Sequence, residues 1–143
     1  MKKLIAVILV AFLAQYAWND PGLRERLHYA GPDAAAVLAQ AFENRQSDVQ
    51  VSGEGVVIKL LPDDNEGSRH QRFILRLASG QTLLVAHNID LAPAIVSLRV
   101  GDTVEFFGEY EWNPKGGVIH WTHHDPANHH VSGWLKHQGK TYQ

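Results

Sequence analysis

The sequence predicts a mostly β fold, a small five-stranded OB-like Greek-key barrel preceded by an N-terminal hydrophobic leader and one or two short helices. Three observations indicate this fold. After residue 48, apolar residues recur with a period of two, which is the spacing of half-buried strands. Turn residues such as Gly, Pro and Asp separate five such segments. The order strand-strand-strand-short helix-strand-strand then matches an OB-fold.

Three segments are expected along the 143 residues. Residues 1–18 are a signal peptide or an uncleaved signal anchor. Residues 19–47 are a linker with short helices, and residues 48–143 are the barrel domain with a His- and Trp-rich C-terminal tail. A chain of this length normally holds one domain plus extensions. A hydrophobic content of 45% with 20% charged residues is typical of a folded globular protein.

The N-terminus predicts export. Lys2 and Lys3 precede an apolar run at residues 4–14, which is the pattern of a secretory signal peptide and is too short for an ordinary membrane-spanning helix. Phe12 and Gln15 stand where a cleavage site needs small residues, so the segment is also a candidate for an uncleaved anchor. The expected location is the periplasm, or the inner membrane facing the periplasm. A buried N-terminal helix is the alternative.

A helix is predicted over residues 34–44, with Asp33 as its N-cap. Its apolar residues fall on one stripe, which indicates that the helix packs against another part of the protein. The stripe consists of Ala34, Val37, Leu38, Ala41 and Phe42.

The first strand is predicted over residues 49–61, with Gly53 and Gly55 inside it. Glycines within a long strand suggest a bulge or a sharp bend, by which a strand wraps around a small barrel. A short helical segment is expected between Asn88 and Leu98. The remaining strands are predicted at residues 70–77, 82–87, 103–112 and 118–123.

Two strands have well-separated faces because their residues alternate. In the second strand, one face carries Gln71, Phe73, Leu75 and Leu77, and the other carries His70, Arg72, Ile74 and Arg76. In the fourth strand, one face carries Val104, Phe106, Gly108 and Tyr110, and the other carries Glu105, Phe107, Glu109 and Glu111. The apolar faces are expected to line the barrel.

Several stretches are shared with a bacterial family of small proteins known as a domain of unknown function. They include GEYEWN at residues 108–113 and GGVIHWTHHDP at residues 116–126. The chain resembles this family over roughly residues 48–143. The resemblance supports that domain boundary and implies no activity, substrate or catalytic residue.

The outward face of the second strand is the predicted ligand-binding surface. OB-folds commonly bind ligands on the face of strands 2 and 3, and arginine side chains there can hold a carboxylate or a phosphate bidentately. A solvated face paired with glutamates is the alternative. The predicted ligand-binding residues are His70, Arg72, Arg76, His87, Trp112 and His120.

The histidine-rich motif after the fifth strand is a candidate metal site, because neutral imidazole is the commonest nitrogen ligand of zinc. On an extended strand, His120 and His124 would lie about 13 Å apart, at ~3.3 Å per residue, and His123 would face the other way. A site therefore requires the strand to end near Thr122 or a ligand from elsewhere. The metal candidates are His120, His123, His124 and Asp125. The alternative is a polar rim whose histidines bind the backbone.

The sequence favours an exported OB-like binding module that holds a small anionic or polar ligand or a protein partner, with no assigned catalytic residue. A metal-assisted hydrolase of the phosphodiesterase or nuclease type, using the His-rich rim, is the alternative. In that case His70 would be the base, and Arg72 and Arg76 would stabilise charge. No cofactor is expected beyond a zinc or other divalent metal ion at the rim.

Composition and motifs exclude several classes of site and of enzyme. The chain has no cysteine, which excludes disulfides, thiolate metal sites and a cysteine nucleophile. It has no Gly-x-Ser-x-Gly, P-loop, dinucleotide or His-Glu-x-x-His motif. Its net charge is −2, or −4 without Lys2 and Lys3, so nucleic acid is not an expected partner, although an OB-fold could bind it by stacking.

Overall fold

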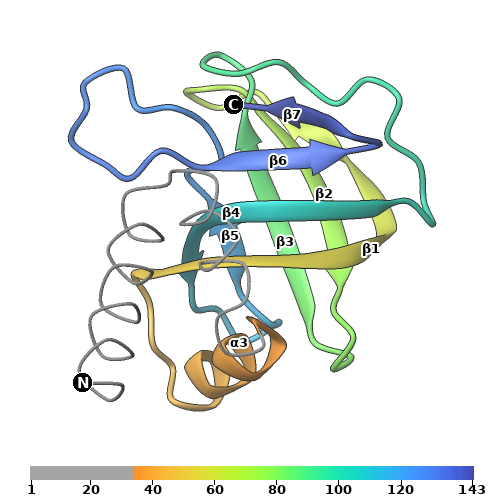
Figure 1. Cartoon of the computed structure of the whole chain (residues 1–143), viewed down its shortest axis with the longest axis vertical. Coiled ribbons are helices and arrows are strands. Elements are labelled where there is room, and N and C mark those ends of the chain that lie inside the picture. Colours follow the sequence, from red (N-terminus) through yellow and green to blue (C-terminus); the bar gives the residue numbers. More distant parts are fainter. Residues whose placement is uncertain (1–33) are drawn as a thin grey trace, which may run out of the picture. The chain divides into compact units, whose positions relative to one another are not determined.

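The computed structural model describes residues 34–143, which form one helix and seven strands (Figure 1). The predicted leader, the linker up to residue 33 and the cap Asp33 lie outside the described residues. The elements are α3 (Ala34–Glu43), β1 (Val49–Asp64), β2 (His70–Arg76), β3 (Thr82–Asn88), β4 (Thr103–Glu111), β5 (Val118–His120), β6 (Trp134–His137) and β7 (Lys140–Tyr142). Among residues 34–143, no helix combines the length and the apolar content needed to cross a membrane.

Five strands form a ring in the order β1-β2-β3-β5-β4, because β4 pairs back onto β1 (Figure 1). All of these pairings are antiparallel except β3 with β5, which is parallel and joins only two residue pairs. The mostly β, OB-like fold predicted from the sequence is confirmed. Beyond β4, the sheet continues through β6 and β7.

Strand β1 belongs to both sides of the ring. Its first half pairs with β4, from Val49 to Val56, and its second half pairs with β2, starting again at Val56. The pairing with β4 runs through Gly53 and Gly55 without a shift, and the irregularities lie later, at Val57/Lys59 and Leu61/Asp64. The predicted bulge therefore falls after the two glycines.

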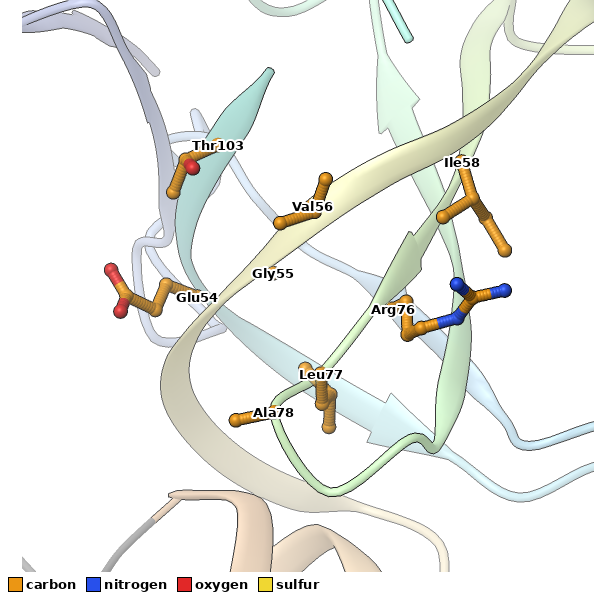
Figure 2. Close-up of a pocket in the computed structure, with 8 residues that line it drawn as sticks. All are labelled: Glu54, Gly55, Val56, Ile58, Arg76, Leu77, Ala78 and Thr103. Carbon is orange, nitrogen blue, oxygen red and sulfur yellow. The ribbon is translucent and has the colours of Figure 1, made fainter. Parts of the chain in front are cut away.

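The two glycines of β1 are needed for close packing instead. A Cβ atom on Gly53 would lie 2.9 Å from Cζ of Phe106, and one on Gly55 would lie 3.0 Å from the carbonyl oxygen of Arg76. Strand β1 curves near Gly55, just before Val56, where its pairing passes from β4 to β2 (Figure 2).

The core follows the predicted alternation. Phe73, Leu75, Phe106 and Tyr110 are fully buried, whereas their neighbours in sequence are half-buried or exposed. Helix α3 packs against the barrel through Leu38 and Ala41. Each large apolar side chain that is fully buried contributes about 1.5–3 kcal/mol to stability through the hydrophobic effect. The predicted packing of this helix is confirmed.

The segment between β3 and β4 contains turns and no helix, so the predicted short helix is wrong. The side-chain amide of Gln71 explains the difference. It donates from Nε2 to the carbonyl of Ile95 (2.9 Å) and accepts from the backbone N–H of Ile95 (2.8 Å). These contacts satisfy backbone groups that helical hydrogen bonds would otherwise satisfy, and they hold the buried Ile95 side chain in the core.

The C-terminal region differs from expectation in two ways. Strand β5 ends at His120, before the predicted residue 123, because Trp121 adopts a φ of 54°. The hairpin of β6 and β7 was not predicted. Its turn is Gln138-Gly139, with φ values of 49° and 78°, and positive φ at both positions is the mark of a type I′ hairpin turn.

Candidate functional site

Glu109, Glu111 and His120 lie on one face of the antiparallel pair of strands β4 and β5. Glu109 lies opposite His120 in the antiparallel register, and Glu111 follows on the same face of β4. The Nε2 atom of His120 lies 3.5 Å from Oε1 of Glu111 and 4.0 Å from Oε2 of Glu109. This nitrogen is buried and makes no hydrogen bond with any described residue. We call these three residues the rim cluster.

His130 closes over the rim cluster from the loop before β6. Its Nε2 lies 2.5 Å from Oε2 of Glu109, and its Nδ1 lies 2.8 Å from the carbonyl oxygen of Val131. Burial lowers the pKa of His130, but the hydrogen bonds to Val131 and Glu109 outweigh burial and raise this pKa above its ordinary value. Both ring nitrogens face acceptors, as expected for an imidazolium that donates twice.

Trp121 organises the rings around the rim cluster. Its indole stacks on His130, with centroids 4.1 Å apart and planes 8° apart, and His123 lies 5.4 Å away. The φ of 54° places a tryptophan in the left-handed region, which costs about 1–3 kcal/mol and is often found at functional sites. The backbone turn therefore costs stability while it holds His130 over Glu109.

Of the four predicted metal ligands, only His120 lies in the rim cluster. His123 is buried, and its Nδ1 donates to the carbonyl oxygen of His124 at 2.7 Å. The side chain of His124 is exposed. The structure does not bring these histidines together around one point.

Asp125, the fourth predicted ligand, orders the loop that carries His130. Its carboxylate accepts the backbone N–H groups of Ala127 (2.9 Å), His129 (2.7 Å) and His130 (2.8 Å). Burial raises the pKa of Asp125, but these three donors outweigh burial and lower the pKa below its usual range.

Two predicted ligand-binding residues on β2 make local contacts. The Nδ1 atom of His70 lies 2.8 Å from the carbonyl oxygen of Ser68. Arg72 donates from Nε and Nη2 to the carbonyl oxygen of Pro62, at 3.1 and 3.0 Å. The side chain of His70 therefore secures the loop between β1 and β2, and that of Arg72 secures the end of β1.

His87, predicted to lie beside these residues, points into the protein instead. It pairs with Gln71 on the inward face and is fully buried. Burial lowers the pKa of His87 from 6.5 to about 4. Its Nε2 lies 3.0 Å from the carbonyl oxygen of Pro93 and must carry the proton, so Nδ1 accepts from the hydroxyl of Thr122 at 2.7 Å. His87 thus joins β3 to two separate loops.

Trp112, another predicted ligand-binding residue, attaches α3 to the barrel. Its Nε1 donates to the carbonyl oxygen of Phe42 (3.0 Å), and its ring stacks on Phe42 with centroids 6.4 Å apart. The guanidinium of Arg45 lies over the ring of Trp112, 5.3 Å from its centroid. Its partly buried ring packs against the core.

Arg76 is the predicted ligand-binding residue that reaches open space. It lines a groove of about 370 Å³ at the point where β1 leaves β4 for β2 (Figure 2). Within residues 34–143, its guanidinium has no hydrogen-bond or ion-pair partner. The groove, which we call the β1 groove, is lined by Glu54, Gly55, Val56, Ile58, Arg76, Leu77, Ala78 and Thr103.

Sequence reasoning placed Glu109 and Glu111 on the exterior of β4 but did not connect them to His120. The signal was present, since a Glu-x-Glu pair ends one strand and, after a turn at residues 113–117, a histidine ends the next. Only the register, with Glu109 opposite His120, shows that they meet.

The ring of strands, the rim cluster and the β1 groove define an OB-like β-barrel domain with two candidate sites. The chain belongs to the family described as "Protein of unknown function (DUF3465)", which matches residues 26–143. This confirms the resemblance to a domain-of-unknown-function family. A comparison with curated proteins gives no match.

Proposed function

We propose that this protein is an exported OB-like binding module whose β1 groove holds a small anionic ligand with an apolar body. The observation that carries the proposal is the exposed guanidinium of Arg76, which borders a largely apolar groove and has no partner among the described residues. A volume of about 370 Å³ is within the range of ~300–1,000 Å³ that small-molecule sites occupy.

The lining of the groove favours one negative charge on the ligand. Arg76 presents a planar donor pair that fits a carboxylate. Val56 and Ile58 supply apolar surface, and Val56 remains 42% exposed although it is a large hydrophobic residue. Glu54 lies on the other side of Gly55 from Arg76 (Figure 2) and would repel a second anionic group. A small aliphatic carboxylate satisfies these conditions, as does the C-terminal carboxylate of a protein partner.

Nucleic acid is a poor fit to these requirements of the β1 groove. The outer face of β4 carries Glu105, Glu109 and Glu111, and the net charge of the chain is −2. A polyanion near this face would meet repulsion without the basic surface that phosphate neutralisation requires.

Binding in the groove is testable with octanoate as the probe. Titration of the ¹⁵N-labelled protein should shift the amide signals of residues 54–58 and 76–78, with saturation. Arg76→Gln should weaken binding at least ~10-fold, the equivalent of about 1.4 kcal/mol. Lys59→Gln is the matched control, because Lys59 is an exposed cation of the same strand outside the groove. Equal affinity of the Arg76→Gln variant and the wild type would contradict the proposal.

Export rests on Lys2, Lys3 and the apolar residues 4–14. Fractionation of a Gram-negative host should recover the protein from the periplasm or the inner membrane. Replacement of Leu9 by Arg within the apolar run should retain the protein in the cytoplasm. Equal cytoplasmic recovery of the wild type would contradict export.

A metal-assisted hydrolase is the second candidate, and the rim cluster is the observation that favours it. An ion held by three protein donors keeps a coordination position for a water molecule, whose pKa it lowers. Hydrolysis of bis(p-nitrophenyl) phosphate in the presence of zinc or manganese, lost in the Glu111→Gln variant, would support this candidate over a binding module. Absence of turnover with either metal would remove it.

A further inference from the structure

We propose that Glu109, Glu111 and His120 bind one divalent transition-metal ion, zinc or manganese. One ligand atom from each residue, two carboxylate oxygens and an imidazole nitrogen, lie within 4.8 Å of one another. The three residues come from β4 and β5, which are hydrogen-bonded neighbours. Backbone pairing therefore fixes the Cα positions of the three residues before an ion arrives, which reduces the entropic cost of binding.

The distances are close to those a metal ion requires. Zinc lies about 2.0–2.2 Å from nitrogen and oxygen ligands, so that two donors of a tetrahedral site are roughly 3.5 Å apart. The 3.5 Å between Nε2 of His120 and Oε1 of Glu111 meets this value. The 4.0 Å between Nε2 of His120 and Oε2 of Glu109 is about 0.5 Å longer than this value.

The Nε2 atom of His120 is an independent sign of a missing ligand. It is buried and has no hydrogen bond within residues 34–143, and such a buried polar atom costs about 1–3 kcal/mol. A metal ion would satisfy the nitrogen lone pair directly. It would also relieve the repulsion between two carboxylates whose oxygens lie within 4.8 Å of each other.

The donor set selects the kind of ion. Two carboxylates and an imidazole suit zinc or manganese better than calcium or magnesium, which prefer oxygen ligands alone. His130 already donates to Glu109 and orients that carboxylate, as groups behind metal ligands commonly do. Glu111 contacts only His120 among the described polar side chains, and so keeps its negative charge available to the ion.

This site is independent of the β1 groove. Thr103 of the groove and Glu109 lie six residues apart on β4, which is about 20 Å at ~3.4 Å per residue. Loss of metal binding would therefore not alter octanoate binding, and the two proposals can fail separately.

The test uses the full chain, purified without a polyhistidine tag and stripped with a chelator. Isothermal titration with zinc chloride, and separately with manganese chloride, should give one tight site per chain for at least one of the two. Imidazole ¹⁵N spectra of the metal-free and the zinc-loaded protein should be compared. The chemical shift of Nε2 of His120 should change more than that of any other histidine nitrogen.

Variants decide whether the rim cluster is the site. His120→Ala and Glu111→Gln should each weaken the tight site at least ~10-fold. His129→Ala is the matched control, because His129 is exposed and lies outside the cluster, and it should leave the affinity unchanged. Circular dichroism verifies folding, and Glu111→Gln decides the question if His120→Ala does not fold. The proposal is wrong if folded Glu111→Gln binds as tightly as the wild type, or if the wild type binds neither ion at 100 μM.

Discussion

The carboxylate of Asp102 lies 2.8 Å from Nε2 of His137, and this contact connects the turn before β4 to the end of β6. The side chain of His137 is 1% exposed. Asp102 also accepts the backbone N–H of Arg99 at 3.0 Å. A hydrogen bond from His137, followed by the one from Arg99, lowers the pKa of Asp102 below its usual range. The pair therefore ties the C-terminal hairpin to the five-stranded ring.

Replacement of His137 by Ala should destabilise the domain by about 2 kcal/mol, because it removes a buried side chain and leaves Asp102 without its partner. The measurement is urea unfolding at pH 7. A double-mutant cycle with Asp102→Asn should show that the two substitutions are not additive. Strict additivity would show that the contact contributes nothing to stability.

The buried His87 predicts loss of stability in mild acid. Its pKa is about 4 in the folded protein and takes the ordinary value of 6.5 in the unfolded chain. The unfolded chain therefore binds the proton first as the pH falls. The contribution of neutral His87 is complete above pH 6.5 and is lost progressively between pH 6.5 and 4, by about 3 kcal/mol in total.

The measurement is the free energy of unfolding at several values of pH in this window. The comparison is His87→Gln, which has no titrating group but keeps a donor and an acceptor. The variant should lose less stability than the wild type between pH 6.5 and 4. Parallel curves for the two proteins would show that His87 is not responsible.

Gly108 should tolerate no side chain. A Cβ atom there would lie 2.5 Å from the carbonyl oxygen of His120 and 3.0 Å from the side chain of Ile119, so that β4 and β5 would have to separate. Gly108→Ala should cost about 3 kcal/mol or more. The control is Gly139→Ala, which has open space around it and pays only for its φ of 78°, about 1–2 kcal/mol. A smaller loss for Gly108→Ala than for Gly139→Ala in thermal unfolding would contradict this packing.

The indole of Trp112 should determine how firmly α3 is attached. Trp112→Phe keeps an aromatic ring against Phe42 but removes the donor to its carbonyl oxygen, at a cost of about 1 kcal/mol. Amide hydrogen exchange should accelerate in α3. Trp134→Phe is the control, because Trp134 packs on Phe107 and Lys136, away from the helix. Unchanged exchange in α3 of the Trp112→Phe variant would rule out this role.

The elements that the sequence predicted well depend on local patterns. The alternation of Phe73 and Leu75, or of Phe106 and Tyr110, follows from the period of a strand and is visible without any partner. The segment after β3 was mispredicted because Gln71, more than twenty positions away, supplies its hydrogen bonds to Ile95. Strands β6 and β7 are four and three residues long, too short for a periodic signal.

The candidate sites were less predictable, because a site depends on register and on what each side chain already contacts. Arg72 and Arg76 look equivalent on one face of β2, but Pro62 engages the first and leaves the second free in the described chain. His120 and Glu109 meet only because β4 and β5 pair in one register. A shift of one residue would place them on opposite faces of the sheet.

Val56 is the residue at which β1 changes its pairing partner. Before Val56 the strand is hydrogen-bonded to β4, and after it the strand is hydrogen-bonded to β2. A ligand in the β1 groove would contact β1, β2 and the start of β4. A bound ligand would link the strands on both sides of Val56. Local opening, and with it amide hydrogen exchange, would then become slower throughout the barrel and not only at the residues that the ligand covers.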